Sequence, residues 1–176
     1  MQTQHGTHRH NAEVSFVAAA SNSGKTTLIE KLIPLLKVRG LTVGVLKHAS
    51  KGFDPDRPGK DSWRFREAGA DIVAVTGPAG TTVMRRGECE PASGDLGHIL
   101  GACDVVLREG FKKAGGDRFE VFRSGISGTR PLCLDDPSFI ALATDTKFDV
   151  SMPQFDLNDE KSIAAFIMEK YLHEQQ

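Results

Sequence analysis

The chain has 176 residues, with 22 Lys and Arg against 23 Asp and Glu, so its formal charge is −1 at pH 7. A near-neutral chain offers no extended basic surface, which excludes nucleic acid as the expected partner. No apolar run approaches the roughly 20 residues of a membrane helix, and the N-terminus has no hydrophobic signal core. We therefore expect a cytoplasmic protein that does not contact a membrane.

The expected domain organisation is one folded unit behind a polar tail. Residues 1–12 are polar and rich in histidine, and nothing apolar there would compensate for the entropy lost on ordering, so we expect a disordered N-terminal tail. Residues 13–176 are long enough to bury a substantial core as a single phosphate-loop nucleotide-binding domain. The cysteines are Cys89, Cys103 and Cys133, and their wide spacing indicates reduced thiols.

Five short apolar runs are predicted to be strands of a central parallel sheet, because they are apolar almost throughout, as strands covered on both faces are. Helical stretches lie between them, and this alternation predicts the α/β class. We expect a three-layer sandwich of the phosphate-loop NTPase type, with a mainly parallel sheet. The predicted strands are 14–18, 42–46, 71–75, 104–107 and 139–143, and the predicted helices are 26–39, 60–68, 95–102 and 159–172.

Two further segments break this alternation. Residues 81–86 and 118–123 follow turn residues and alternate polar with apolar side chains. Such a pattern is typical of antiparallel strands with one solvated face. We expect them to form an additional antiparallel ribbon at an edge of the sheet or at a dimer contact.

The stretch ASNSGKTT, residues 20–27, lies between the first predicted strand and the first predicted helix. Its end matches the phosphate-loop (Walker A) template GxxxxGK[ST], although Ala19 stands where the first glycine is expected. Loop amides would surround phosphate oxygens, Lys25 would neutralise the β- and γ-phosphates, and Thr26 would bind Mg²⁺. The alternative is a helix cap made by a loop serine. The candidate nucleotide-binding residues of the loop are Ser21, Asn22, Ser23, Gly24, Lys25, Thr26 and Thr27.

Two carboxylates are candidates for the metal shell and for catalysis. Glu109 ends the fourth predicted strand, and Asp61 opens the second predicted helix after a long polar loop. Mg²⁺ prefers carboxylate oxygen, so Asp61 and Glu109 join Thr26 as candidate metal ligands. Together with Lys25 they are also the candidate catalytic residues. The alternative for Asp61 is that it only caps its helix.

Four residues outside the loop are further candidates for nucleotide contacts. Lys47 and His48 leave the second predicted strand, and Lys60 directly precedes Asp61. Asp145 follows the last predicted strand, where its carboxylate would accept hydrogen bonds from N1 and N2 of guanine, donors that adenine does not present in that arrangement. The alternative for Asp145 is a turn-forming residue, since the NKxD pattern for guanine is absent from the sequence.

Several stretches taken together point to one family. They are SNSGKTTLIEKLIPLLKVRG, KH followed by FDPDRPGKDS, AGA and EGFK. Their combination resembles the molybdopterin-guanine dinucleotide biosynthesis adapter proteins over about residues 14–172. The resemblance implies a phosphate-loop domain, usually a homodimer, that binds GTP and Mg²⁺ and hydrolyses GTP slowly at best.

The same resemblance implies partners in molybdenum cofactor biosynthesis. A guanylyltransferase that attaches GMP to molybdopterin is the first of them, and molybdopterin itself and molybdoenzymes are further candidates. Ser50 and Lys51 stand where some relatives carry additional histidines, so a metal or pterin site built on histidines is not expected here.

Two other functions stay open at this point. A small-molecule kinase of the phosphate-loop class would use Asp61 as a base and Arg85 or Arg86 on the donor phosphates, and would transfer phosphate to an acceptor instead of water. A non-catalytic scaffold would bind only inorganic phosphate in its loop, and would show no affinity for nucleotides.

Overall fold

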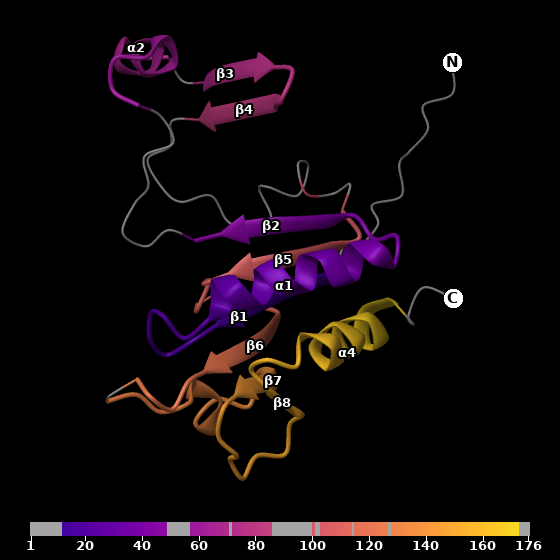
Figure 1. The fold of residues 1–176 in the computed structure, drawn as a ribbon. Helices are drawn as coiled ribbons and strands as arrows, with labels where there is room; N and C mark the ends of the chain where they lie inside the picture. Colours follow the sequence, from indigo (N-terminus) through magenta and orange to yellow (C-terminus); the bar gives the residue numbers. More distant parts are fainter. Residues whose placement is uncertain are drawn as a thin grey trace. The chain divides into compact units, whose positions relative to one another are not determined.

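The computed structural model describes residues 12–48, 57–70, 72–85, 100, 103–113, 115–126 and 128–172. They belong to two compact units, one made by residues 1–48 with 97–176 and the other by residues 49–96 (Figure 1). The predicted helix at 95–102 lies outside the described residues except at position 100.

The larger unit is built on a six-stranded sheet in which every described pairing is parallel. The strand order is β2-β5-β1-β6-β7-β8. In chain order the strands are β1 (Ala12–Val17), β2 (Val43–Lys47), β5 (Val105–Glu109), β6 (Asp117–Phe122), β7 (Phe139–Thr144) and β8 (Gln154–Asp156). Because the strands are parallel, their carboxyl ends share one edge of the sheet, which is where ligands bind in such folds.

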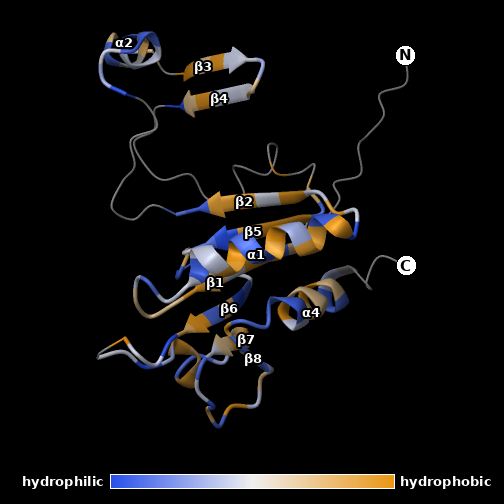
Figure 2. Cartoon of the chain, in the orientation of Figure 1, coloured by the Kyte–Doolittle hydropathy of each residue, from blue (hydrophilic) through white to orange (hydrophobic). Residues whose placement is uncertain are grey.

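Two helices cover one face of this sheet. They are α1 (Lys25–Val38) and α4 (Glu160–Leu172), which also pack against each other. Leu28, Ile29, Leu32 and Leu36 line the buried side of α1 at helical spacing, and Figure 2 shows the alternation of hydrophobic and hydrophilic stretches along this helix. No helix in the described ranges is long and apolar enough to cross a membrane.

The opposite face of the sheet combines a smaller apolar cluster with buried polar residues. Alternate side chains of a strand point to opposite faces, so Glu120 lies on this second face although its neighbour Phe119 lies on the first. Both oxygens of the Glu120 carboxylate accept backbone N–H groups at 2.8 Å, from Leu132 and Cys133 of the short 3-10 helix η2 (Leu132–Leu134). A fully buried carboxylate therefore holds this turn against the sheet.

Cys133 is a free thiol in this buried environment. Burial, together with the neighbouring Glu120 carboxylate, raises the pKa of Cys133 to about 12. The thiol is therefore protonated at neutral pH and packs as a small apolar side chain.

The prediction for residues 118–123 was wrong. The segment forms β6, a parallel strand between β1 and β7, and not an antiparallel strand with a solvated face. The polar residues that suggested such a face are paired inside the protein: Arg118 forms an ion pair with Asp136 at 2.7 Å and stacks over Phe139, and Glu120 binds the backbone amides of η2. Polar side chains that have partners within the protein thus alternate with apolar ones along β6, in the same pattern that a strand with one solvated face shows.

The smaller unit contains α2 (Asp61–Glu67) and the hairpin of β3 (Ile72–Gly77) and β4 (Gly80–Arg85). The segment at 71–75 was predicted to join the central parallel sheet, and this was wrong, because its strand pairs antiparallel with β4 across a tight turn at Gly77 and Gly80. The ribbon at 81–86 was predicted to be antiparallel, which β4 confirms. The α/β class with a mainly parallel sheet and a separate antiparallel ribbon is thus confirmed.

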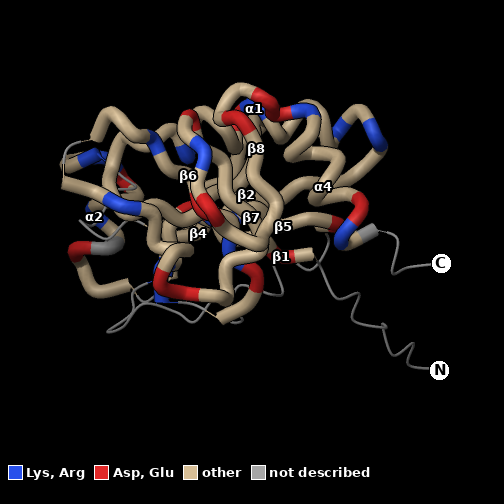
Figure 3. The backbone as a smooth tube through the Cα atoms, turned by 90° about the horizontal axis from the view of Figure 1, so that it is seen from below, with Lys and Arg blue, Asp and Glu red and all other residues tan. Residues whose placement is uncertain are grey.

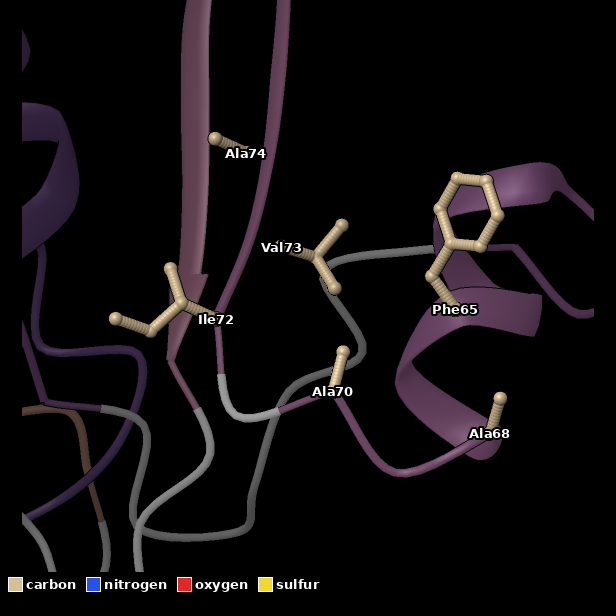
Figure 4. A pocket seen from close by; sticks show the side chains of 6 residues that line it. All are labelled: Phe65, Ala68, Ala70, Ile72, Val73 and Ala74. Atoms are coloured by element: carbon tan, nitrogen blue, oxygen red, sulfur yellow. The ribbon is translucent and has the colours of Figure 1, made fainter.

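A hollow of about 540 Å³ lies in the smaller unit between α2 and β3. Figure 4 shows that the side chains lining it are all hydrocarbon, so none of them can bind a phosphate. They are Phe65, Ala68, Ala70, Ile72, Val73 and Ala74. The charged groups that could bind an anion lie instead at the carboxyl edge of the sheet in the larger unit.

Candidate functional site

The loop after β1 turns sharply into α1 through two residues of positive φ. These are Asn22 at 62° and Gly24 at 99°. Asparagine and glycine tolerate this left-handed conformation better than other residues do. Gly24 is the N-cap residue of α1, and no described side chain caps the helix there. The alternative that a loop serine caps the helix is therefore not what the structure shows, and the first-turn amides have no partner within the helix.

Ala19 does not need the freedom of a glycine. The non-glycine residues of positive φ among the described ones are Asn22 and Phe111. Ala19 adopts an ordinary conformation, so replacing the first glycine of the template introduces no backbone strain at this position.

The Lys25 ammonium points back into the loop. It donates to the Ala20 carbonyl oxygen at 3.4 Å and to the Ser23 hydroxyl at 3.3 Å. Burial lowers the pKa of Lys25 from its usual value; the Glu109 carboxylate opposes this shift, and the nearby Lys112 and Lys47 ammonium groups add to it. These three neighbours show that several charged groups meet at the loop.

Glu109 links the ends of β5 and β2 to the start of α1. Its Oε1 accepts a hydrogen bond from the Thr26 hydroxyl at 2.9 Å, although the two residues are 83 positions apart in the sequence. Its Oε2 lies 3.4 Å from Nζ of Lys47 at the end of β2, and the Glu109 side chain is 15% exposed. Two residues predicted to bind the metal are thus in direct contact at the carboxyl edge of the sheet.

Lys112 closes the loop from the other side. Its Nζ donates to the Ala19 carbonyl oxygen at 3.1 Å, which ties the segment after β5 to the start of the phosphate loop. His48 lies beside this segment: its amide donates to the Glu109 carbonyl oxygen at 3.0 Å, and its ring lies 5.5 Å from that of Phe111. His48 is therefore at the rim of the site, in an aromatic contact.

The described residues do not form a metal site made of protein side chains alone. In the part of the chain that the structure describes, no three His, Cys, Asp or Glu side chains gather in a way that would hold an ion. Mg²⁺ is commonly bound by one or two protein oxygens together with phosphate oxygens and water. The pair of Thr26 and Glu109 fits this mode, and it does not fit a closed cage.

A second group of polar residues lies at the ends of β6 and β7. Oδ1 of Asp145 accepts the Ser124 amide at 2.8 Å, and this hydrogen bond is the main cause that lowers the pKa of Asp145. Arg123 precedes Ser124, and its Nη2 lies 3.5 Å from the position that a Cβ on Gly24 would occupy. Asp145 is thus linked through one loop to the edge of the phosphate loop.

Arg123 is the residue of this region that sequence reasoning missed. Its segment was assigned to an antiparallel ribbon, so its position directly after a central strand was not recognised. Correct assignment of β6 would have provided the signal, because residues that follow a parallel strand lie at the ligand-binding edge.

Two predicted site residues belong to the smaller unit. Asp61 begins α2 and lies 3.8 Å from Arg64 of the same helix, with its side chain 85% exposed. Lys60 immediately precedes it and is exposed. Both residues belong to the smaller unit, and their part in the site stays a prediction. Figure 3 shows that acidic and basic residues are interspersed along the described chain.

The remaining loop residues differ in exposure. Ser21, Asn22, Thr26 and Thr27 are exposed, whereas Ser23 is buried and accepts the hydrogen bond from Lys25. The exposed residues lie where a ligand can reach them. Ser23 instead supports the position of the lysine.

Comparison with known proteins identifies relatives of this chain. The family described as "Molybdopterin guanine dinucleotide synthesis protein B" matches residues 14–145. The molybdopterin-guanine dinucleotide biosynthesis adapter protein of Escherichia coli (strain K12) is 37% identical over 158 residues, covering 86% of this chain and 89% of the relative. The protein of the same name from Haemophilus influenzae is 35% identical over 162 residues, covering 89% and 88%.

A solved structure is similar as well. The crystal structure of a molybdopterin-guanine biosynthesis protein B covers 91% of this chain and 99% of its own, with 30% sequence identity and a TM-score of 0.68. The range that matches the family model, residues 14–145, contains the phosphate loop, Glu109 and Asp145.

Proposed function

The chain belongs to the family of molybdopterin guanine dinucleotide synthesis protein B, and we propose that it binds GTP as an adapter in molybdenum cofactor biosynthesis. Its relatives carry the name of adapter proteins for molybdopterin-guanine dinucleotide biosynthesis. The chemistry of the phosphate loop supports a nucleoside triphosphate as the ligand. The adapter role would then be to serve an enzyme that attaches GMP to molybdopterin.

The observation that carries this proposal is the gathering of three lysines at an uncapped helix start. Lys25, Lys47 and Lys112 lie close enough for the charges of the last two to lower the pKa of the first. The Glu109 carboxylate lies 3.4 Å from the Lys47 ammonium, and its charge also acts on Lys25. Among the described residues, three ammonium groups and one carboxylate meet here, which favours a strongly anionic ligand, and the amides of the first turn of α1 add their positive dipole.

Each residue then has a distinct task. The loop amides and Lys25 would bind the β- and γ-phosphates, and Lys47 and Lys112 would add positive charge on either side. Thr26 and Glu109 would hold Mg²⁺, which would neutralise charge on the phosphate oxygens. Asp61 and Lys60 stay candidates for the same site from the smaller unit.

We propose that GTP hydrolysis is slow at most. Glu109 contacts the Thr26 hydroxyl and the Lys47 ammonium, and we assign it with Thr26 to Mg²⁺ instead of to the attacking water. In NTPases of this class the residue that orients the water and an arginine on the γ-phosphate supply most of the acceleration. The residues assigned here bind the triphosphate tightly without adding either group.

Self-association is part of the same proposal. The smaller unit exposes four large apolar side chains with 46–61% of their surface open in the single chain, namely Phe65, Ile72, Val75 and Val83. Ile72 and Val83 lie on the same face of the β3–β4 hairpin, since Val83 pairs with Ala74, and apolar side chains exposed in this way are typical of a protein interface. We propose a homodimer, with the guanylyltransferase as the external partner and molybdopterin as the molecule on which that partner acts.

Guanine recognition is assigned to Asp145, and substituting it with asparagine tests the assignment. Asparagine keeps an oxygen that can accept the hydrogen bond from the Ser124 amide. Its other terminal group is an amide NH₂, which cannot accept a hydrogen bond from guanine. We expect the preference for GTP over ATP to fall by about tenfold or more, since hydrogen bonds to a charged group contribute roughly 1.5–3 kcal/mol. Calorimetric dissociation constants for both nucleotides with Mg²⁺ would measure the ratio.

Asp149→Asn is the matched control, because Asp149 is exposed, follows the same strand and has no role in the proposed site. Its ratio should equal that of the unmodified protein. If the ratio is the same in Asp145→Asn, the base is read elsewhere and this part of the proposal is wrong.

A further inference from the structure

Arg123 occupies a defined place at the edge of the phosphate loop. It directly follows β6, which pairs with β1 on the side opposite to β5. Its Nη2 lies 3.5 Å from the site of a Cβ on Gly24, so the guanidinium lies against the last glycine of the loop. The residue is exposed, which leaves the guanidinium open to a ligand.

The backbone at Arg123 is held from both sides. Asp145 accepts the amide of the next residue, Ser124, at 2.8 Å, and the Ile126 amide donates to the Arg123 carbonyl oxygen at 3.4 Å. The positive charge of Arg123 also contributes to lowering the pKa of Asp145. A guanidinium on an anchored backbone beside the loop has less freedom to lose when a ligand binds.

The strand order indicates which part of the nucleotide Arg123 would meet. Glu109 and Lys47 lie at the ends of β5 and β2, on one side of the loop after β1, and would face the metal and the terminal phosphate. Asp145 lies at the end of β7, on the other side, where the base is assigned. The chain of α- and β-phosphates between base and terminal phosphate must then pass the ends of β1 and β6.

Resting on the proposed function, we infer that Arg123 is a further nucleotide-binding residue, which contacts the α- and β-phosphates and leaves the γ-phosphate to Lys25. Its planar guanidinium can donate two parallel hydrogen bonds to phosphate oxygens. The contact would be the same in GDP and GTP, because both carry these two phosphates. Arg123 would thus hold the nucleotide before and after hydrolysis.

Binding of GDP and GTP to Arg123→Ala tests this inference. We expect both dissociation constants to rise by a similar factor, about 10- to 100-fold, as for the loss of a charge-assisted contact. Arg123→Lys should recover part of the affinity, since lysine restores the charge without the paired donors. Circular dichroism would show that the variants are folded, and Arg123→Met, which keeps an unbranched, largely apolar side chain without the charge, would replace alanine if that variant unfolds.

Arg130→Ala is the control, because Arg130 is also exposed and pairs with Asp135 at 3.0 Å, away from the proposed site. It should bind both nucleotides like the unmodified protein. Unchanged binding of both nucleotides to Arg123→Ala would overturn the inference, as would a loss restricted to GTP, which would place the guanidinium on the γ-phosphate. If the unmodified protein binds neither nucleotide, the proposed function itself fails, and the inference fails with it.

Discussion

Replacing Lys25 with alanine should weaken GTP binding by about 100-fold or more and leave the protein folded. Charge-assisted hydrogen bonds contribute roughly 1.5–3 kcal/mol each, and the ammonium is assigned to oxygens of two phosphates. In the structure its hydrogen bonds go to the Ala20 carbonyl and the Ser23 hydroxyl of its own loop, and not to the hydrophobic core. Calorimetric titration with GTP and Mg²⁺ would measure the loss.

The pH dependence of GTP binding provides a second readout for Lys25. Burial lowers the pKa of Lys25 below the usual 10.5. The ammonium therefore loses its proton at a lower pH than an ordinary lysine does, and affinity should fall as the pH rises toward 10.5. This alkaline loss should be smaller in the residual binding of Lys25→Ala. Lys37→Ala, an exposed lysine in the last turn of α1, is the matched control. Equal affinity of Lys25→Ala and Lys37→Ala would contradict the role given to Lys25.

Replacing Glu120 with alanine should lower the free energy of unfolding by about 3–5 kcal/mol. The substitution leaves the backbone amides of Leu132 and Cys133 without their acceptors, and each unsatisfied buried donor costs roughly 1–3 kcal/mol, to which the vacated volume adds. Glu120→Gln should lose less, because one oxygen acceptor remains. Urea denaturation followed by circular dichroism would measure both changes.

The exposed residue Glu169 on α4 serves as the control for Glu120. Glu169→Ala should change the free energy of unfolding by less than about 0.5 kcal/mol, as surface substitutions usually do. A loss below about 1 kcal/mol for Glu120→Ala would show that η2 rearranges to satisfy its amides, and would remove the stabilising role assigned to this carboxylate.

Four strands of the sheet could be predicted from their apolar runs. The runs assigned to 14–18, 42–46, 104–107 and 139–143 correspond to β1, β2, β5 and β7. Of these, β1, β5 and β7 are largely buried, as the apolar run predicts, whereas β2 is an edge strand in which Val45 is 46% exposed. The short strand β8 escaped notice, since three residues are too few to show a period. Its start is fixed by the Gln154 side chain, which both donates to and accepts from the backbone of Phe148.

The errors arose where local pattern and tertiary environment disagree. In β6 the polar residues Arg118 and Glu120 have partners that come from the segment after Arg130, and no local pattern reveals such partners. In β3 the apolar run resembles a buried strand, yet Ile72 is 61% exposed in the single chain. Pattern alone does not distinguish a strand buried in a sheet from one in a hairpin with exposed apolar residues.

The candidate site was predictable where a motif fixes it and not where the topology does. The loop motif led to Lys25 and Thr26, and the end of an apolar strand led to Glu109, which the structure places in contact with Thr26. Their roles in binding stay predictions. Arg123 carries no motif, and its position follows only from the placement of β6 next to β1.

Calorimetric titration of the unmodified protein with GTP tests whether the chain binds a nucleoside triphosphate, as proposed for the loop between β1 and α1. We expect saturable binding of about one GTP per chain with Mg²⁺ present, and weaker binding when EDTA removes the metal. No detectable binding at about 1 mM GTP with excess Mg²⁺ would contradict it.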